Sequence, residues 1–183
     1  LKQDGSGLAA ARTAQMRLTV PGGTLMELPS AGAQKFTRVA PDAGLIDISM
    51  DNPQPMGRAD DADTRYQRSS VMVDSSDPRI ARLADAALRG VKNEPMARVT
   101  ALRSAVSRHL TRKDLASGFA TASEAAASRG GDCTEHAVLL AACLRHAGIP
   151  ARVASGLVYV AEIQGTRNAL GWHMWTQALV DGH

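Results

Sequence analysis

The chain has 183 residues, enough for one hydrophobic core and a smaller appendage, and 44% of them are hydrophobic, as in folded globular proteins. The net charge is +3 and the pI is near 9.2, but the 21 basic and 18 acidic residues are interspersed and only 3% of residues are aromatic. With no basic block and no apolar run of roughly 18 residues, the sequence predicts neither a nucleic-acid-binding surface nor a membrane span.

The first residue is Leu1 rather than Met, and no basic segment followed by an apolar stretch opens the chain. We therefore expect a piece of a longer protein. The compartment stays open, with a periplasmic or exported parent as one alternative, and the oligomeric state is open too. Cys133 and Cys143 make no disulfide framework, because on one helix they would lie about 15 Å apart.

Residues 1–75 are expected to form a β-rich N-terminal region that ends in a linker. The polar residues 1–15 are predicted to be loose. Apolar residues that alternate or cluster between turn signals predict short strands at residues 16–20, 25–28, 45–48 and 71–73. Residues 51–63 contain two prolines and four aspartates, which favours a loop.

Helical signals dominate after residue 76. Asp77-Pro78 predicts a cap and a first helical residue, and Gly90 ends that helix. A second helix is expected after Pro95, with an apolar stripe of Met96, Val99, Leu102, Val106 and Leu110. The sequence Thr121-Ala122-Ser123-Glu124 resembles a capping box that opens a short helix, stopped by Gly130-Gly131.

The stretch from Cys133 to Ala147 is apolar almost all round, which predicts a buried helix capped by Asp132 and stopped by Gly148. A strand is expected at residues 151–160, a loop at 161–171 and a second strand at 172–180. Asp181-Gly182 is a hairpin-turn dipeptide. A further strand is expected to follow this turn, so the domain is predicted to be incomplete at its C-terminal end.

Cys133 is the candidate nucleophile. It stands in the first turn of the predicted helix, where the helix dipole favours a thiolate and free N–H groups can stabilise an oxyanion. Gly130 and Gly131 would allow a substrate backbone to come close. The alternative is a small buried hydrophobic residue, which is the role expected for Cys143 within the same helix.

A cysteine nucleophile needs a base, and the chain has five histidines. His173 shares one face of a predicted strand with Trp175, Gln177 and Leu179. A polar ring there is either a catalytic base or a hydrogen-bonded core histidine, and the pattern alone leaves both open. His136 follows Cys133 by one helical turn and is given at most a secondary role in lining the site.

Three motifs occur in order along the chain: Gly131-Asp132-Cys133-Thr134-Glu135-His136-Ala137, Gly148-Ile149-Pro150-Ala151-Arg152 and His173-Met174-Trp175. Together they resemble the nucleophile motif, the following Gly-Ile-Pro-Ala-Arg and the His-x-Trp of the transglutaminase-like superfamily. The resemblance covers roughly residues 75–183. It implies an α+β, papain-like core over residues 76–183, in which a buried cysteine helix packs on an antiparallel sheet.

The resemblance implies a cysteine-dependent acyl transfer on peptide or protein carboxamides, of transglutaminase, amidase or protease type. Cys133 would form a thioester and His173 would act as base, while Gly131, Asp132, His136 and Trp175 would bind the oxyanion or line the substrate site. The family's orienting Asp lies beyond His183, so this piece alone would be inactive if that group is essential. Asp181 is a turn residue and not that Asp.

Two alternatives remain. One is a degenerate transglutaminase-like module that binds or scaffolds without activity. The other is an arylamine N-acetyltransferase-like acyltransferase, because Arg129-Gly130-Gly131-Asp132-Cys133-Thr134-Glu135 also resembles that family's motif, although His136-Ala137 departs from it. No cofactor is implied, and no zinc or calcium spacing is found.

Overall fold

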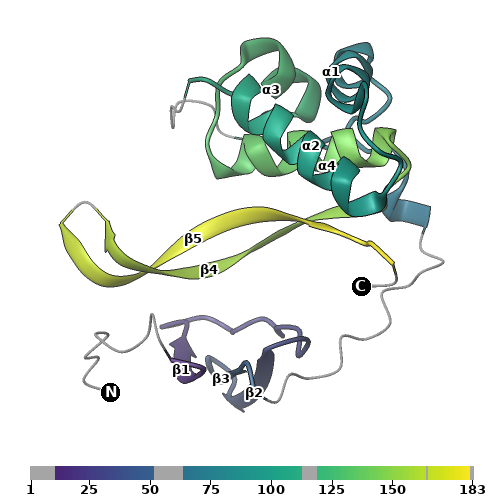
Figure 1. Cartoon of the computed structure of the whole chain (residues 1–183). Coiled ribbons are helices and arrows are strands. Elements are labelled where there is room, and N and C mark those ends of the chain that lie inside the picture. Colours follow the sequence, from purple (N-terminus) through teal and green to yellow (C-terminus); the bar gives the residue numbers. More distant parts are fainter. Residues whose placement is uncertain (1–10, 52–63, 113–118, 164, 182–183) are drawn as a thin grey trace. The chain divides into compact units, whose positions relative to one another are not determined.

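The computed structural model describes residues 11–51, 64–112, 119–163 and 165–181. The chain divides into two compact units, residues 1–60 with 159–170 and residues 61–158 with 171–183. Figure 1 labels their elements. The division of the chain at residue 75 stays a prediction, and so does the loop expected at residues 52–63, which lies outside the described residues.

The first unit contains a three-stranded antiparallel sheet in the order β1-β3-β2. Its strands are β1 (Thr13–Thr19), β2 (Gln34–Ala40) and β3 (Ala43–Ser49). Leu25, Phe36 and Ile46 form its small core. Gly44 lies under the Phe36 ring, where an added Cβ would come within 2.3 Å of a ring carbon.

The strand predictions in this region are only partly correct. Strands exist near residues 16–20 and 45–48, but β1 begins at Thr13, inside the stretch predicted to be loose. Residues 25–28 and 71–73 form no strand. Leu25 and Val73 are nevertheless buried. Each lies on irregular backbone and packs into the hydrophobic core of its own unit. Strand β2 was not predicted, since Phe36 is its one buried residue.

The second unit is built on helices α1 (Pro78–Leu88), α2 (Pro95–His109), α3 (Ala122–Ser128) and α4 (Cys133–His146), with a short 3₁₀ turn at Thr64–Tyr66. The predicted caps are confirmed, because Asp77, Thr121 and Asp132 each accept a hydrogen bond from the first turn of the helix that follows. The stripe on α2 is also correct, except that Met96 is 59% exposed.

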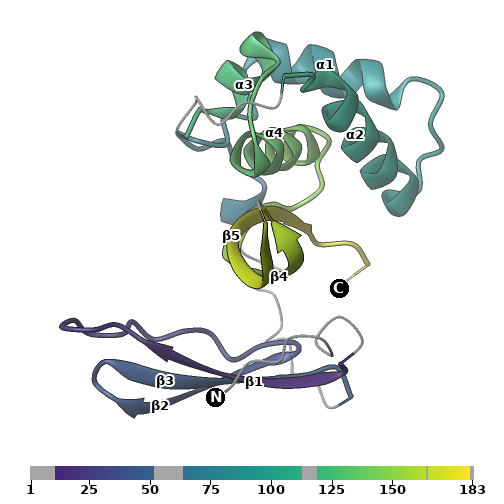
Figure 2. The ribbon, with the colours of Figure 1, turned by 90° about the vertical axis from the view of Figure 1, so that its left-hand side faces the viewer.

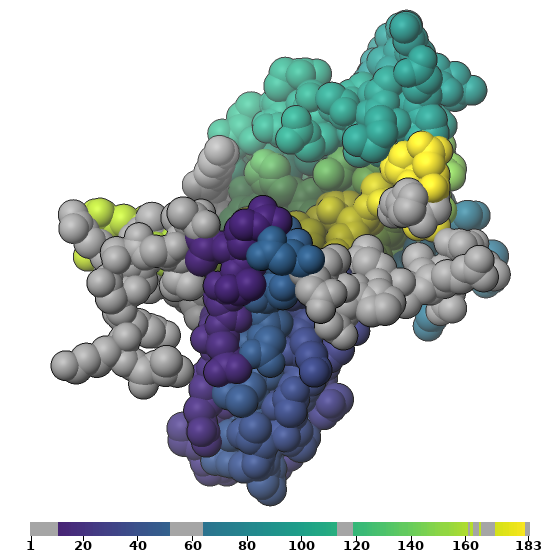
Figure 3. Space-filling model, turned by 60° about the horizontal axis from the view of Figure 1, so that its bottom comes forward, coloured from purple at the N-terminus to yellow at the C-terminus, as the bar shows by residue number. Residues whose placement is uncertain are grey.

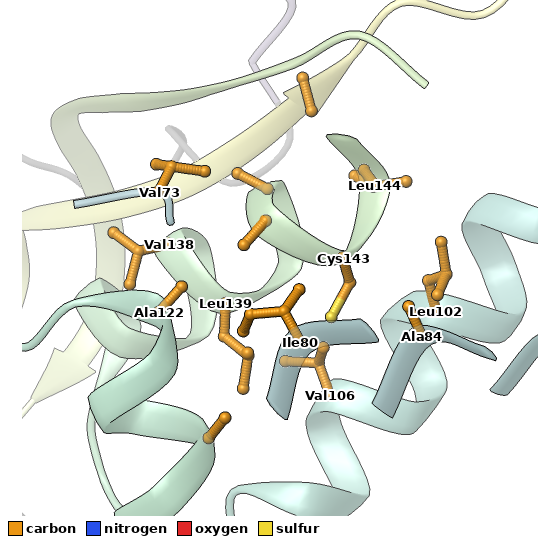
Figure 4. Close-up of a cluster of buried hydrophobic side chains, with 14 of the residues drawn as sticks. Val73, Ile80, Ala84, Leu102, Val106, Ala122, Val138, Leu139, Cys143 and Leu144 are labelled. Atoms are coloured by element: carbon orange, nitrogen blue, oxygen red, sulfur yellow. The ribbon is translucent and has the colours of Figure 1, made fainter. Parts of the chain in front are cut away.

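Helix α4 is the centre of this unit. Figure 2 looks along its axis and shows it between the other helices and a β-hairpin. Its apolar side chains meet α1, α2 and α3 in one cluster, in which Ile80, Leu102 and Leu139 are fully buried. Figure 4 shows the sulfur of Cys143 directed into this cluster beside Ile80. An apolar circumference therefore predicted the burial of α4 correctly.

The hairpin consists of β4 (Ala151–Ile163) and β5 (Thr166–Ala178). The loop predicted at residues 161–171 is wrong, because both strands extend through it to a turn at Gly165, whose φ is +78°. Asp181 has the left-handed φ of +52° expected in a turn, and Gly182 lies outside the described residues. None of the described helices is both long enough and apolar enough to cross a membrane.

Candidate active site

Cys133 is the first residue of α4 because a reciprocal capping box begins the helix there. The Asp132 carboxylate accepts a hydrogen bond from the Thr134 N–H at 2.8 Å. In return, the Asp132 N–H donates to the Glu135 carboxylate at 3.0 Å. Cys133 is half-buried, so its thiol lies at the surface of a pocket and not in the core. The predicted position of this thiol at a helix start is confirmed.

The Cys133 N–H is the one backbone donor from residue 131 to residue 136 that has no acceptor within the described segment 119–163. Each of the others is bonded: Gly131 donates to the Arg112 carbonyl at 2.9 Å, Asp132 to Glu135 Oε2, Thr134 and Glu135 to the Asp132 carboxylate, and His136 to the Asp132 carbonyl at 3.1 Å. Gly131 and Asp132 can therefore line the pocket, but their own N–H groups are occupied.

His136 folds back over the first turn of α4, as helical side chains do. Its Nδ1 lies 2.7 Å from the Asp132 carbonyl oxygen. Because a carbonyl only accepts, Nδ1 carries the hydrogen, and Nε2 of the neutral ring is then a hydrogen-bond acceptor. His136 is thus a half-buried imidazole of defined tautomer, one turn from the thiol.

Strand β5 meets α4 through alternate residues. The Thr176 hydroxyl donates to the Ala137 carbonyl at 2.9 Å, and the Thr134 hydroxyl donates to the Met174 sulfur at 3.3 Å. His173 and Trp175 occupy the intervening positions and are exposed, with ring centroids 6.4 Å apart and nearly parallel planes. Among the described residues, the His173 ring makes no hydrogen bond with Cys133 or with any other group.

The ring of Trp175 packs close to the backbone of β4 at Gly156, where there is no side chain. A Cβ added at Gly156 would lie 3.1 Å from the Trp175 ring, so a larger residue there would push the indole slightly away. The indole also lies beside the His173 ring on β5.

These residues line one pocket of about 730 Å³ between α2, α4 and β5. All six residues predicted from the sequence contribute to it: Gly131, Asp132, Cys133, His136, His173 and Trp175. Figure 3 shows the three elements side by side on one face, with α2 in teal, α4 in green and the end of β5 in yellow.

Sequence reasoning missed the contribution of α2, from which Arg103 and Ser107 also line the pocket. They lie four residues apart and so on one helix face, but nothing in the local sequence shows that this face meets the cysteine helix. It also missed Glu135, a fully buried carboxylate two residues after the nucleophile candidate.

The second thiol differs sharply from the first. Cys143 is fully buried among apolar side chains, and burial raises the pKa of its thiol to about 12. It therefore stays a neutral thiol at any physiological pH. The prediction that Cys143 is packing is consistent with this environment.

A thiol at the start of a buried helix, which lines one pocket with a histidine on an adjoining hairpin, is typical of an α+β core of the papain-like class. The sequence model of the Transglutaminase-like superfamily matches residues 81–183, more than half of the chain. The chain therefore belongs to the transglutaminase-like superfamily.

Two solved structures share the fold, both with a TM-score of 0.57. A candidate cysteine protease from Cytophaga hutchinsonii is 14% identical, over 92% of this chain and 62% of its own length. The periplasmic domain of TgpA from Pseudomonas aeruginosa, bound to ethylmercury, is 21% identical over 91% of this chain and 68% of its own. The chain thus spans only about two thirds of these structures. No curated protein matches it.

Proposed function

We propose that this chain carries the nucleophile and base of a cysteine-dependent acyl transfer on peptide or protein carboxamides. The observation that carries the proposal is the pocket that Cys133 and His173 both line, in which the Cys133 N–H has no acceptor among the described residues. Membership of the transglutaminase-like superfamily supports the same chemistry.

In the proposed reaction His173 accepts the thiol proton of Cys133, and the thiolate attacks the carboxamide carbon. The Cys133 N–H donates to the oxyanion that forms. The C–N bond then breaks, and the amine leaves with the proton held by His173. Water or a second amine attacks the thioester, its proton passes to the sulfur through His173, and the C–S bond breaks.

The exposed position of His173 fits this role if its ring turns toward the sulfur once a substrate displaces water from the pocket. Catalytic hydrogen bonds are often open in unliganded enzymes and close with substrate. Trp175 and His136 would flank the substrate, since both line the same pocket.

The proposal is tested by amine incorporation. The chain, and any longer protein that contains it, are incubated with a glutamine-containing peptide and a fluorescent primary amine, and coupled product and released ammonia are both measured. Cys133→Ala should abolish both signals, whereas Cys143→Ala should retain them. Turnover that is identical in the unaltered protein and its Cys133→Ala variant would reject the enzyme and favour a binding or scaffold module.

A further inference from the structure

Glu135 is a buried carboxylate that takes no part in the steps of the proposed reaction. Its side chain is 0% exposed and is among the largest fully buried side chains of the molecule. No Lys, Arg or His of the described residues pairs with it. A carboxylate removed from water in this way is costly unless hydrogen bonds replace its hydration.

Two backbone donors from different segments replace that hydration. The Ala120 N–H, just before α3, donates to Oε1 at 3.1 Å, and the Asp132 N–H donates to Oε2 at 3.0 Å. The side chain therefore ties the backbone leading into α3 to the backbone leading into the cysteine helix.

Gly131 packs directly against this carboxylate. Its φ is +144°, and an added Cβ would lie 2.3 Å from the Glu135 Cβ. The glycine before Asp132-Cys133 is thus required by the close approach of its own chain to Glu135, whatever its role toward a substrate.

A second capping box in the same unit shows what is special about Glu135. Glu124 on α3 also accepts the N–H of its N-cap residue, Thr121, at 2.8 Å. Its side chain is exposed, and no described residue from another segment donates a hydrogen bond to it. Glu124 therefore caps a helix, whereas Glu135 caps a helix and joins two segments.

This arrangement determines where the Cys133 N–H can point. The N–H of Asp132 is turned to Glu135 and that of Gly131 to the Arg112 carbonyl, so both peptide units before Cys133 are held in place. We infer that Glu135 is a positioning residue, which fixes the Cys133 N–H as the oxyanion donor of the site. This inference rests on the proposed acyl transfer.

The test compares two reactions of Cys133 in the whole chain and in Glu135→Gln. Acylation by p-nitrophenyl acetate passes through an oxyanion, whereas alkylation by iodoacetamide does not. An amide at position 135 places an NH₂ group against one of the two N–H donors, which displaces that segment. Acylation should fall at least about 10-fold, less than the about 10²–10³-fold of an oxyanion donor that is removed outright, because the donor is displaced and not lost. Alkylation should change less than about twofold.

Glu124→Gln is the matched control, because it makes the same chemical change in the exposed capping box. It should leave the acylation and alkylation rates of Cys133 within about twofold of those in the unaltered chain. If Glu135→Gln lowers acylation and alkylation equally, or changes neither rate, Glu135 has no specific role in placing the Cys133 N–H. If Cys133→Ala releases nitrophenol as fast as the parent, the proposed function fails instead.

The inference remains testable if Glu135→Gln does not fold. Glu135→Asp keeps the charge but is one methylene too short to reach both donors, so it should show the same split between the two rates. In the unaltered chain, amide exchange followed by NMR should be at least about tenfold slower at Asp132 than at Cys133. Equal exchange at these two amides would contradict the hydrogen bonding on which the inference stands.

Discussion

The two thiols of α4 show how far environment separates chemically identical side chains. Cys133 is half-buried at the N-terminal end of the helix and lines a pocket. There the helix dipole favours an anion, and so does an N–H that has no acceptor in the part of the chain that the structure describes. Cys143 is enclosed by apolar side chains further along the same helix. Reactivity should therefore divide between them by position and not by residue type.

Iodoacetamide should label Cys133 and leave Cys143 unmodified in the folded chain at pH 8. Because burial raises the pKa of Cys143 to about 12, this thiol is neutral at pH 8 and becomes a nucleophile only near that much higher pH. Peptide mapping by mass spectrometry measures the ratio, and urea-unfolded protein serves as control, since both thiols should then react alike. Equal labelling in the folded chain would contradict an activated Cys133.

The residues that sequence reasoning found are those with local signatures. Cys133 follows an N-cap, and His173 belongs to a short motif, so neither required knowledge of the fold. Glu135 was missed because a glutamate near a helix start is normally exposed. Its burial depends on Ala120, fifteen residues away, which no local pattern reveals.

At the level of elements, α4 depends on its cap in the same way as α3. The side chains of Asp132 and Thr121 each accept a hydrogen bond from an N–H of the first helical turn. The backbone N–H of each residue donates to the glutamate three positions later. The two helices thus form a matched pair in which only one carries the pocket thiol.

Asp132→Ala and Thr121→Ala should each lower the free energy of unfolding by about 1 kcal/mol, the usual cost of a lost N-cap. Urea denaturation followed by circular dichroism measures this. The two variants should differ in chemistry, because Asp132→Ala frees the first turn of α4 and slows acylation of Cys133, whereas Thr121→Ala does not. Equal effects on acylation would show that the cap of α4 has no special bearing on the site.

Helix ends could be predicted because caps, prolines and glycines act within a few residues. Strands were predicted less completely, and their ends less accurately, since pairing is decided by distant segments. Residues 161–171 were predicted to be a loop, yet β4 extends to Ile163 and β5 begins at Thr166. Residues 25–28 show the reverse error, because an apolar run there fills a core without forming a strand.

Thr176→Val should destabilise the unit by about 0.5–1.5 kcal/mol. The substitution keeps the side-chain shape but removes the hydroxyl that donates to the Ala137 carbonyl at 2.9 Å, which is one of the contacts between β5 and α4. Thr37→Val on β2 is the control, because Thr37 is exposed and should respond by less than about 0.5 kcal/mol. A Thr176 variant as stable as the parent would show that this contact contributes nothing.

At the scale of the whole molecule, the residues that the structure describes form two hydrophobic cores of unequal size. The small sheet encloses Leu25, Phe36 and Ile46, whereas α4 organises a far larger cluster of buried side chains. The pocket lies in the unit with the larger core, so the stability of that core determines whether the site exists.

Leu139→Ala should therefore lower the free energy of unfolding by about 2–5 kcal/mol, since the side chain is fully buried at the centre of this cluster. Met96→Ala should change it by less than about 0.5 kcal/mol, because Met96 is 59% exposed although its spacing predicted a buried position. Denaturant unfolding of both variants measures the difference. Similar losses would mean that α2 buries Met96 in solution.

Direct detection of the acyl-enzyme tests the account most directly. The chain is treated with p-nitrophenyl acetate, quenched in acid and mapped by mass spectrometry, with hydroxylamine to distinguish a thioester from an amide. The account predicts one hydroxylamine-labile acetyl group on Cys133, formed more slowly in His173→Ala and absent in Cys133→Ala. Acetyl groups found only on lysines, or formation at Cys133 that is unchanged in His173→Ala, would contradict the proposed pair.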